Sequence, residues 1–433
     1  MRRRLIIPAL ALWCSTAAAQ ERPPRPIPPI PVPVRSDARD PSGPGISQRG
    51  FIEGRAFLFP QTAPNDTSRG IGDGLLREEV FLKPARWVQF AAGLDLRANS
   101  HEQVEDQWRL DLTDRGVRRP RAAIRRLSAT VSVHGVNVDI GKQFIRWGRA
   151  DILNPTDRFA PRDFLNVIDS DLLPIIGARG TVQVKKETFE AVWIPQMTPS
   201  RLPLFTERWV VAPPDAHGIA LEDGGSRFPK GSEQGVRWTH AGAHFETSLS
   251  FFNGFNHLPD IESRVLPGRG AVELTRVYPA IRTYGADMII PTGWFTLKGE
   301  AAYFTSPTST SEEYGLYVVE IERQTGEWVF DAGYAGEVVT TSGGSFPFAP
   351  DRGMARSIIG RASYTVDPRR TIAIEGAVRQ SGHGEYVKGE YSEALGQHWR
   401  LTMTGVAITG RTDDFLGQYQ RNSHGSIAFR LSF

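Results

Sequence analysis

The chain has 433 residues, of which 40% are hydrophobic and 23% charged, with a formal net charge of +3. Its mean hydropathy is −0.31. No run of about 18 consecutive apolar residues occurs, which excludes membrane-spanning helices. A single cysteine, Cys14, excludes a framework of disulfide bonds.

The first 19 residues have the order of regions of a secretory signal peptide. Consecutive arginines from Arg2 are followed by the apolar run Leu5 to Trp13 and by three alanines that end at Ala19. Trp13 precedes Cys14 where lipoprotein processing needs a small residue, so we expect cleavage before Gln20. Cleavage removes three of the 51 basic residues and none of the 48 acidic ones. The remaining chain is formally neutral, which removes the electrostatic case for nucleic-acid binding.

Residues 20–46 are dense in proline and contain the stretch RPPRPIPPIPVPVR. This composition predicts a flexible, extended segment without helix or sheet. A docking site for a partner is the alternative interpretation.

From residue 47 onward, many short stretches alternate apolar and polar residues. In residues 87–98, Val88 and Phe90 fall on one face, and Asp95 and Arg97 fall on the other. The same pattern recurs in residues 126–133, 295–303 and 371–379. Such strands are expected of a transmembrane β-barrel, with lipid outside and water inside.

Two kinds of connection separate these stretches. Tight turns are predicted at 83–86, 134–136, 185–188, 241–244, 291–293, 324–327, 367–370 and 394–397. Long polar loops are predicted at 99–120, 196–232, 253–270 and 338–354. Short turns at one end and long loops at the other are typical of outer-membrane barrels. The pattern predicts an all-β, antiparallel barrel of 18 strands, or of 16 if residues 385–393 form a loop.

The chain ends in the alternating stretch HGSIAFRLSF, in which Phe429, Leu431 and Phe433 share an apolar face. A last strand that closes on an aromatic residue resembles the signal by which the barrel-assembly machinery recognises outer-membrane barrels. A secreted β-sandwich or solenoid is the alternative, since those folds also alternate.

One charged stretch, GKQFIRWGRADILNPTDRFAPRDF from Gly141 to Phe164, interrupts the strands. Pro155 and Pro161 exclude a regular strand or a long helix. We expect a loop at about residues 146–172 to fold into the lumen and narrow it, held to the inner wall by charge pairs. The expected constriction residues are Lys142, Arg146, Arg149, Asp151, Asn154, Asp157, Arg158, Arg162 and Asp163. The expected wall residues are Asp95, Arg97, Asp139, Glu300, Glu375 and Arg379. Alternatively, these charges only brace the wall.

The sequence contains no recognised catalytic or metal-binding motif, such as G-x-S-x-G or H-E-x-x-H. We interpret the scattered histidines as turn or interfacial residues, namely His134, His240, His398 and His424. Two acidic pairs, Asp169/Asp171 and Asp413/Asp414, are interpreted as solvated loop charge, with calcium binding as the alternative. We therefore predict a protein that is not an enzyme and has no metal and no cofactor.

At WGRADILNPTDRFAPRDF, EYSEALGQHWRLT and DDFLGQYQRNSHGS the sequence resembles a poorly characterised family of porin-like outer-membrane β-barrels of Gram-negative bacteria. In layout it is distantly similar to alginate-export-type barrels. The resemblance covers residues 47–433 and implies a transport-like role without identifying a substrate.

These observations predict a signal peptide (1–19), a proline-rich flexible periplasmic segment (20–46) and an outer-membrane barrel (47–433). The predicted function is a porin-like channel for passive passage of small polar solutes, set in outer-membrane lipid. The alternatives are an outer-membrane enzyme and a non-conducting structural or partner-binding barrel of an envelope transport system. In the latter, the proline-rich segment would engage a periplasmic partner.

Overall fold

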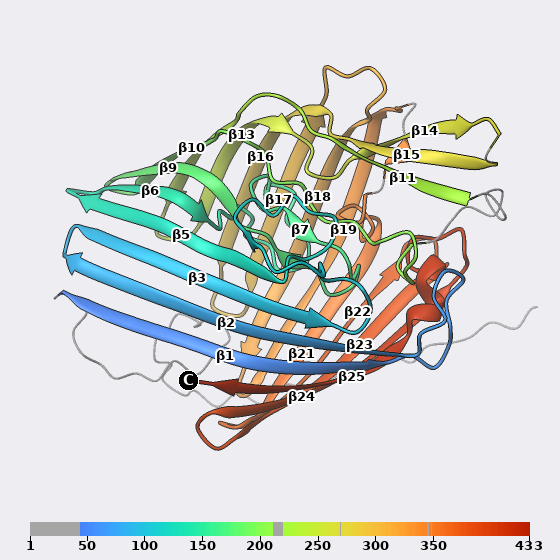
Figure 1. Cartoon of the computed structure of the whole chain (residues 1–433). Coiled ribbons are helices and arrows are strands. Elements are labelled where there is room, and N and C mark those ends of the chain that lie inside the picture. The colour runs from blue at the N-terminus through green and yellow to red at the C-terminus, as the bar shows by residue number, and fades with distance from the viewer. Residues whose placement is uncertain (1–43, 211–219, 269, 344–345, 348) are drawn as a thin grey trace, which may run out of the picture. The chain divides into compact units, whose positions relative to one another are not determined.

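Antiparallel strands of the computed structural model pair in chain order and close into a barrel (Figure 1). The structure describes residues 44–210, 220–268, 270–343, 346–347 and 349–433. Within this part of the chain, the main sheet has 19 strands, one of which, β4 (Leu110–Asp111), is a short parallel addition to β5. The other 18 form the ring.

The barrel strands are β1 (Gly45–Leu58), β2 (Gly70–Ala85), β3 (Val88–Asn99), β5 (Ala122–Val133), β6 (Val136–Gln143), β9 (Ile175–Val184), β10 (Glu187–Ile194), β12 (Glu233–Ala241), β13 (Glu246–Phe255), β16 (Ala280–Pro291), β17 (Thr296–Thr305), β18 (Glu313–Thr325), β19 (Trp328–Thr341), β21 (Ser357–Asp367), β22 (Arg370–Arg379), β23 (Gly384–Leu395), β24 (Trp399–Gly410) and β25 (His424–Ser432). The loops add β7 (Arg162–Asp163), β8 (Asp171–Leu172), a 3-10 helix η2 (Gly417–Asn422), and a small sheet of β11 (Ala220–Arg227), β14 (Asp260–Leu266), β15 (Ala271–Val277) and β20 (Phe346–Pro347).

The ring closes between the first and last strands. β1 pairs with β25 from Phe51 opposite Ser432 to Leu58 opposite Gly425. Gly50 and Phe433 exchange two backbone hydrogen bonds of 3.0 Å each. Closure leaves the barrel sheet without an edge strand, which is the condition for backbone placed in lipid.

The predicted 18-strand antiparallel barrel is confirmed. The 16-strand alternative is wrong, because residues 384–395 form β23, which pairs with both β22 and β24. β1 begins at Gly45, slightly before the predicted barrel boundary. The predicted signal peptide and residues 20–43 of the proline-rich segment lie outside the described residues.

All eight predicted tight turns join neighbouring strands at one end of the barrel, which we call the turn end. At the turn between β5 and β6, His134 and Gly135 have φ angles of 49° and 82°. A two-residue hairpin needs these positive φ values, and glycine adopts them without strain. The connections at the opposite end are longer, except residues 380–383 between β22 and β23.

The two faces of each strand differ as the alternation predicts. On β3, Phe90 points outward and is 46% exposed, whereas Asp95 is 3% exposed inside the ring. Trp87, Trp294 and Trp328 are exposed at the turn end, where amphipathic rings suit a membrane interface. No helix among the described residues is long and apolar enough to span a membrane.

We predict that replacing Phe433 by serine lowers the yield of folded barrel in outer-membrane fractions while export continues. The C-terminal residue completes the strand that must pair with β1, so weaker recognition delays closure. The yield is measured as the heat-modifiable band on unboiled gels. Leu395→Ser is a matched control, because Leu395 is also exposed at the turn end but lies outside the last strand. Equal yields for both variants would contradict the predicted role of the terminal strand.

Candidate functional site

The segment between β6 and β9, residues 144–174, crosses the space that the strands enclose (Figure 1). We call it the lumen loop. It leaves the wall at β6 and makes hydrogen bonds to inward side chains of β17 and β18, on another part of the ring. We therefore take the lumen loop and its wall contacts as the candidate site.

An apolar side of the lumen loop packs against the wall. Trp147 and Phe159 are buried, and their ring centroids are 5.0 Å apart in an edge-on contact. Phe159 also meets Phe252 of β13 at 5.0 Å. Gly235 of β12 makes room, since a Cβ there would come within 2.6 Å of Trp147 and 2.7 Å of Phe159. The sequence interpretation missed this contact, although the aromatic residues among the charges were a signal for it.

Glu300 of β17 holds the backbone of the lumen loop. Its carboxylate accepts hydrogen bonds from the amides of Arg149 (2.8 Å), Ala150 (3.1 Å) and Thr156 (2.8 Å). It also accepts one from the Thr156 hydroxyl at 2.8 Å. A buried carboxylate that meets several donors at once satisfies amides that an irregular loop cannot satisfy itself.

Two more carboxylates act in the same way. Glu320 of β18 accepts from the amides of Asp151 (2.7 Å) and Ile152 (3.3 Å). Within the loop, Asp157 accepts from the amides of Trp147 and Gly148, both at 2.6 Å. The path of the loop is thus set by carboxylates that point at its backbone.

Ion pairs supplement these bonds. Asp151 pairs with Lys298 of β17, and Arg149 pairs with Glu246 of β13. Arg146 lies 3.2 Å from Asp157. Nearby protein groups of opposite charge thus balance much of the charge of the lumen loop.

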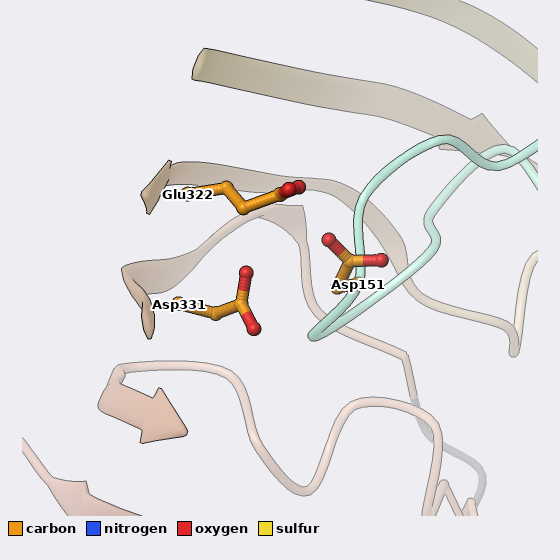
Figure 2. A group of neighbouring side chains, drawn as sticks. All are labelled: Asp151, Glu322 and Asp331. Atoms are coloured by element: carbon orange, nitrogen blue, oxygen red, sulfur yellow. The ribbon is translucent and has the colours of Figure 1, made fainter. Parts of the chain in front are cut away.

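Three carboxylates meet beside this point, as Figure 2 shows. Oxygens of Asp151, Glu322 of β18 and Asp331 of β19 lie within 4.8 Å of one another. Oxygen donors of this kind suit a hard divalent cation. Lys298 bonds to Asp151 and lies 2.5 Å from Glu322, so its ammonium group already neutralises part of the cluster.

A buried chain of charges ties the lumen loop to other loops. Lys142 of β6 pairs with Asp114 at 2.5 Å, and Asp114 pairs with Arg201 at 2.8 Å. Asp163 lies 3.2 Å from Arg201 and 2.8 Å from Arg119. Burial raises the pKa of the Asp163 carboxyl, but the two guanidinium groups outweigh it and leave that pKa well below the usual range.

A second buried group lies next to this chain. Glu207 is 2% exposed, and its Oε2 accepts a hydrogen bond of 2.9 Å from Gln103, while its Oε1 has no hydrogen-bond partner. Burial raises the pKa of Glu207 to about 7. The neighbouring Arg208 pairs with Asp66 at 3.2 Å and therefore does not neutralise Glu207.

The predicted site residues fall into groups. A cavity of about 450 Å³ is lined by Arg146, Asp151, Asn154, Asp157, Arg158, Arg162 and Glu375. The other predicted constriction residues, Lys142, Arg149 and Asp163, contact protein groups in the pairs described above. Arg97 lines a second cavity, of about 340 Å³. Whether these residues meet a solute stays a prediction.

The remaining wall residues have local partners. Asp95 bonds to Arg77 at 2.7 Å, and Asp139 accepts from the Thr130 hydroxyl at 2.5 Å. Arg379 bonds to Asp414 at 3.2 Å and to carbonyls of the loop before β21. Of the six predicted wall residues, Glu300 is the one that bonds to the lumen loop in the described part of the chain.

Three of the four carboxylates considered for calcium contact basic side chains. Asp169 lies 2.7 Å from Lys388 of β23, Asp413 lies 2.9 Å from Arg411, and Asp414 contacts Arg379. Lys388, Lys298 and Glu320 were not among the predicted site residues. Lys388 lies in the stretch that the sequence leaves open between strand and loop, so its inward direction could not be read.

Comparisons with solved structures find barrels of the same kind. OccAB4 of Acinetobacter baumannii has a TM-score of 0.54 at 11% identity, covering 91% of this chain and 99% of that chain. A BenF-like porin of Pseudomonas fluorescens Pf-5 has a TM-score of 0.52 at 11% identity, covering 90% and 98%. For OpdQ of Pseudomonas aeruginosa the TM-score is 0.50 at 11% identity, with 89% and 98% covered.

At this identity the likeness concerns the fold, and it supports the porin-like barrel that the resemblance implied. The similarity to alginate-export-type barrels stays a prediction. No protein-family model matches the sequence, and no curated protein does.

We predict that Glu300→Ala releases the lumen loop. The change leaves three amides and one hydroxyl without their acceptor and should cost about 3 kcal/mol of folding free energy. Trypsin added to the folded barrel should then cut after Arg149 or Arg158, as read by mass spectrometry. Asp139→Ala is the control, because Asp139 bonds to Thr130 rather than to the loop. Equal protease resistance of Glu300→Ala and the wild type would contradict the role of Glu300.

We also predict that Glu207 makes stability depend on pH. Its pKa rises from an ordinary 4.5 to about 7 in the folded chain, so the ionised form is disfavoured there. The penalty is absent below pH 4.5, grows between 4.5 and 7, and is complete above 7. Glu207→Gln should therefore gain up to about 3 kcal/mol over the wild type between pH 4 and pH 8. Urea unfolding followed by tryptophan fluorescence measures this, and a difference independent of pH would contradict it.

Proposed function

We propose that the chain is a porin-type channel of the Gram-negative outer membrane that lets small polar solutes pass by diffusion. The observation that carries the proposal is a closed barrel with an apolar outer face and polar cavities inside. The apolar outer face suits contact with lipid, and the polar cavities suit a solute dissolved in water. The described loops narrow this interior without filling it.

Two further observations support this function and location. One structural neighbour is described as a BenF-like porin, and its barrel covers 90% of this chain. The signal-peptide pattern and the aromatic last strand are both expected of a protein that is exported and assembled in the outer membrane. Assembly machinery and a periplasmic partner for the proline-rich segment remain part of the proposal.

Within this channel, we assign the selectivity to three arginines of the lumen loop. Arg146, Arg158 and Arg162 line the cavity of about 450 Å³. Arg158 lies 3.9 Å from Asp351, and Arg162 donates to the Ser170 hydroxyl at 3.4 Å, so neither charge is tightly paired. Charges that line a narrow aqueous path act on passing ions more strongly than charges on an open surface.

We predict stable conductance steps for the refolded chain in planar bilayers. Replacing Arg146, Arg158 and Arg162 by glutamine should shift the reversal potential in a salt gradient toward cation selectivity. Arg149→Gln is the matched control, because Arg149 already pairs with Glu246 and does not line this cavity.

The results separate the alternatives. A folded barrel without conductance would favour an enzyme or a structural barrel over a channel. A conducting triple variant with unchanged selectivity would remove the three arginines from the path.

A further inference from the structure

One short segment of the lumen loop separates the two cavities. Asn166, Asp169 and Asp171 line the cavity of about 340 Å³, whereas Val167 and Ile168 line the one of about 450 Å³. Ser170 lines both. Neighbouring residues of one strip of chain thus face different cavities, so residues 166–171 form a shared wall between them. We call this strip the partition.

The rest of each cavity belongs to a different arc of the barrel. The smaller cavity is bounded by β1, β2, β3, β24 and β25, with Arg55, Arg97 and Ser426 among its side chains. The larger one is bounded by β18, β19, β21 and β22, with Asp331 and Arg361. Side chains of β23 reach both, because Lys388 lines the smaller cavity and Tyr386 the larger. The partition therefore meets the wall at β23.

An ion pair joins the partition to β23, beside the apolar contacts of Val167 and Ile168. Lys388 Nζ lies 2.7 Å from Asp169 Oδ1, and the two side chains are 18% and 26% exposed. Lys388 stands directly opposite Glu375 in the β22–β23 register, at 3.9 Å from its Oε1. The Tyr386 hydroxyl donates to the same oxygen at 2.8 Å. Lys388 is thus fixed on the wall and reaches inward to the loop.

The partition is also ordered from within. The Asn166 side-chain oxygen accepts from the amides of Ile168 and Asp169, both at 3.1 Å. Val167 and Ile168 pack in an apolar cluster with Trp209 and other residues near β23. Removing the ion pair should therefore open the polar side of the junction, at Asp169 and Lys388. The apolar cluster and the anchors at Glu300 and Glu320 should keep the loop folded.

We propose that the Asp169–Lys388 ion pair divides the lumen and thereby sets the largest solute that can pass. The proposal rests on the channel function proposed above and names two residues that determine its specificity. With the pair in place, a solute can pass through only one of the two narrow cavities. Without the pair, the gap between the partition and β23 joins them into one wider passage.

The charges of the pair give the proposal a distinctive signature. Without Lys388, the carboxylates of Asp169 and Glu375 lose their cation, so passage should shift toward cations. Without Asp169, the ammonium group of Lys388 loses its closest anion, and passage should shift toward anions. Both changes remove the same junction, so both should enlarge the passage.

The test uses the full chain in planar bilayers and in liposomes loaded for swelling assays with neutral sugars of increasing size. Lys388→Ala and Asp169→Ala should each raise conductance by about 1.5-fold and admit larger sugars, with opposite shifts in ion selectivity. The double alanine variant should keep the larger size limit and return to the selectivity of the wild type. The charge-conserving variant Lys388→Arg should keep the wild-type size limit, because its guanidinium group can still pair with Asp169 and faces Glu375 as Lys388 does.

Arg49→Ala is the control, because it breaks a pair of the same 2.7 Å length with Glu79 and lines neither cavity. Heat modifiability verifies folding of each variant. Unchanged sugar cut-offs in the two single variants would overturn the partition while leaving the channel in place. Absence of conductance in the wild type would instead refute the channel itself. A larger sugar cut-off in Lys388→Arg, equal to that of Lys388→Ala and with folding intact, would also overturn the partition.

Discussion

The backbone amides of an irregular segment inside a barrel need hydrogen-bond acceptors. This constraint explains the position of the lumen loop. The lumen loop contains three prolines and makes few regular hydrogen bonds, so its amides need acceptors from elsewhere. Glu300 and Glu320, on neighbouring strands of the far wall, provide them. Because each carboxylate binds several amides, two wall positions suffice to fix one stretch of chain.

Packing and charge then act on opposite sides of the same loop. Trp147 and Phe159 fill the space that Gly235 leaves at the wall. The charged side chains are left to face the cavities or to pair with one another. The apolar side of the lumen loop attaches it to the wall, and its charged side faces the cavities.

Buried charges link the lumen loop to the loops around it, in addition to apolar clusters such as that of Phe164, Leu202 and Leu258. Arg201 bonds to both Asp114 and Asp163, which come from two different loops. A buried pair of this kind is costly to break, because the remaining partner keeps its desolvation penalty. Glu207 lies beside this network with a carboxylate oxygen that has no hydrogen-bond partner, and burial raises its pKa.

The sequence by itself predicted the barrel and its eight tight turns and limited the strand number to 18 or 16. Period-two alternation and turn residues act between neighbours along the chain, so one sequence carries them in readable form. It also located the loop, since two prolines among eight charges cannot form a strand. Only the tertiary structure decided which charges meet. Glu300 is separated from the amide of Arg149 by 151 residues, and Lys388 from Asp169 by 219. No local sequence pattern encodes such a pair, because the pairing depends on the position of each strand in the barrel relative to the lumen loop.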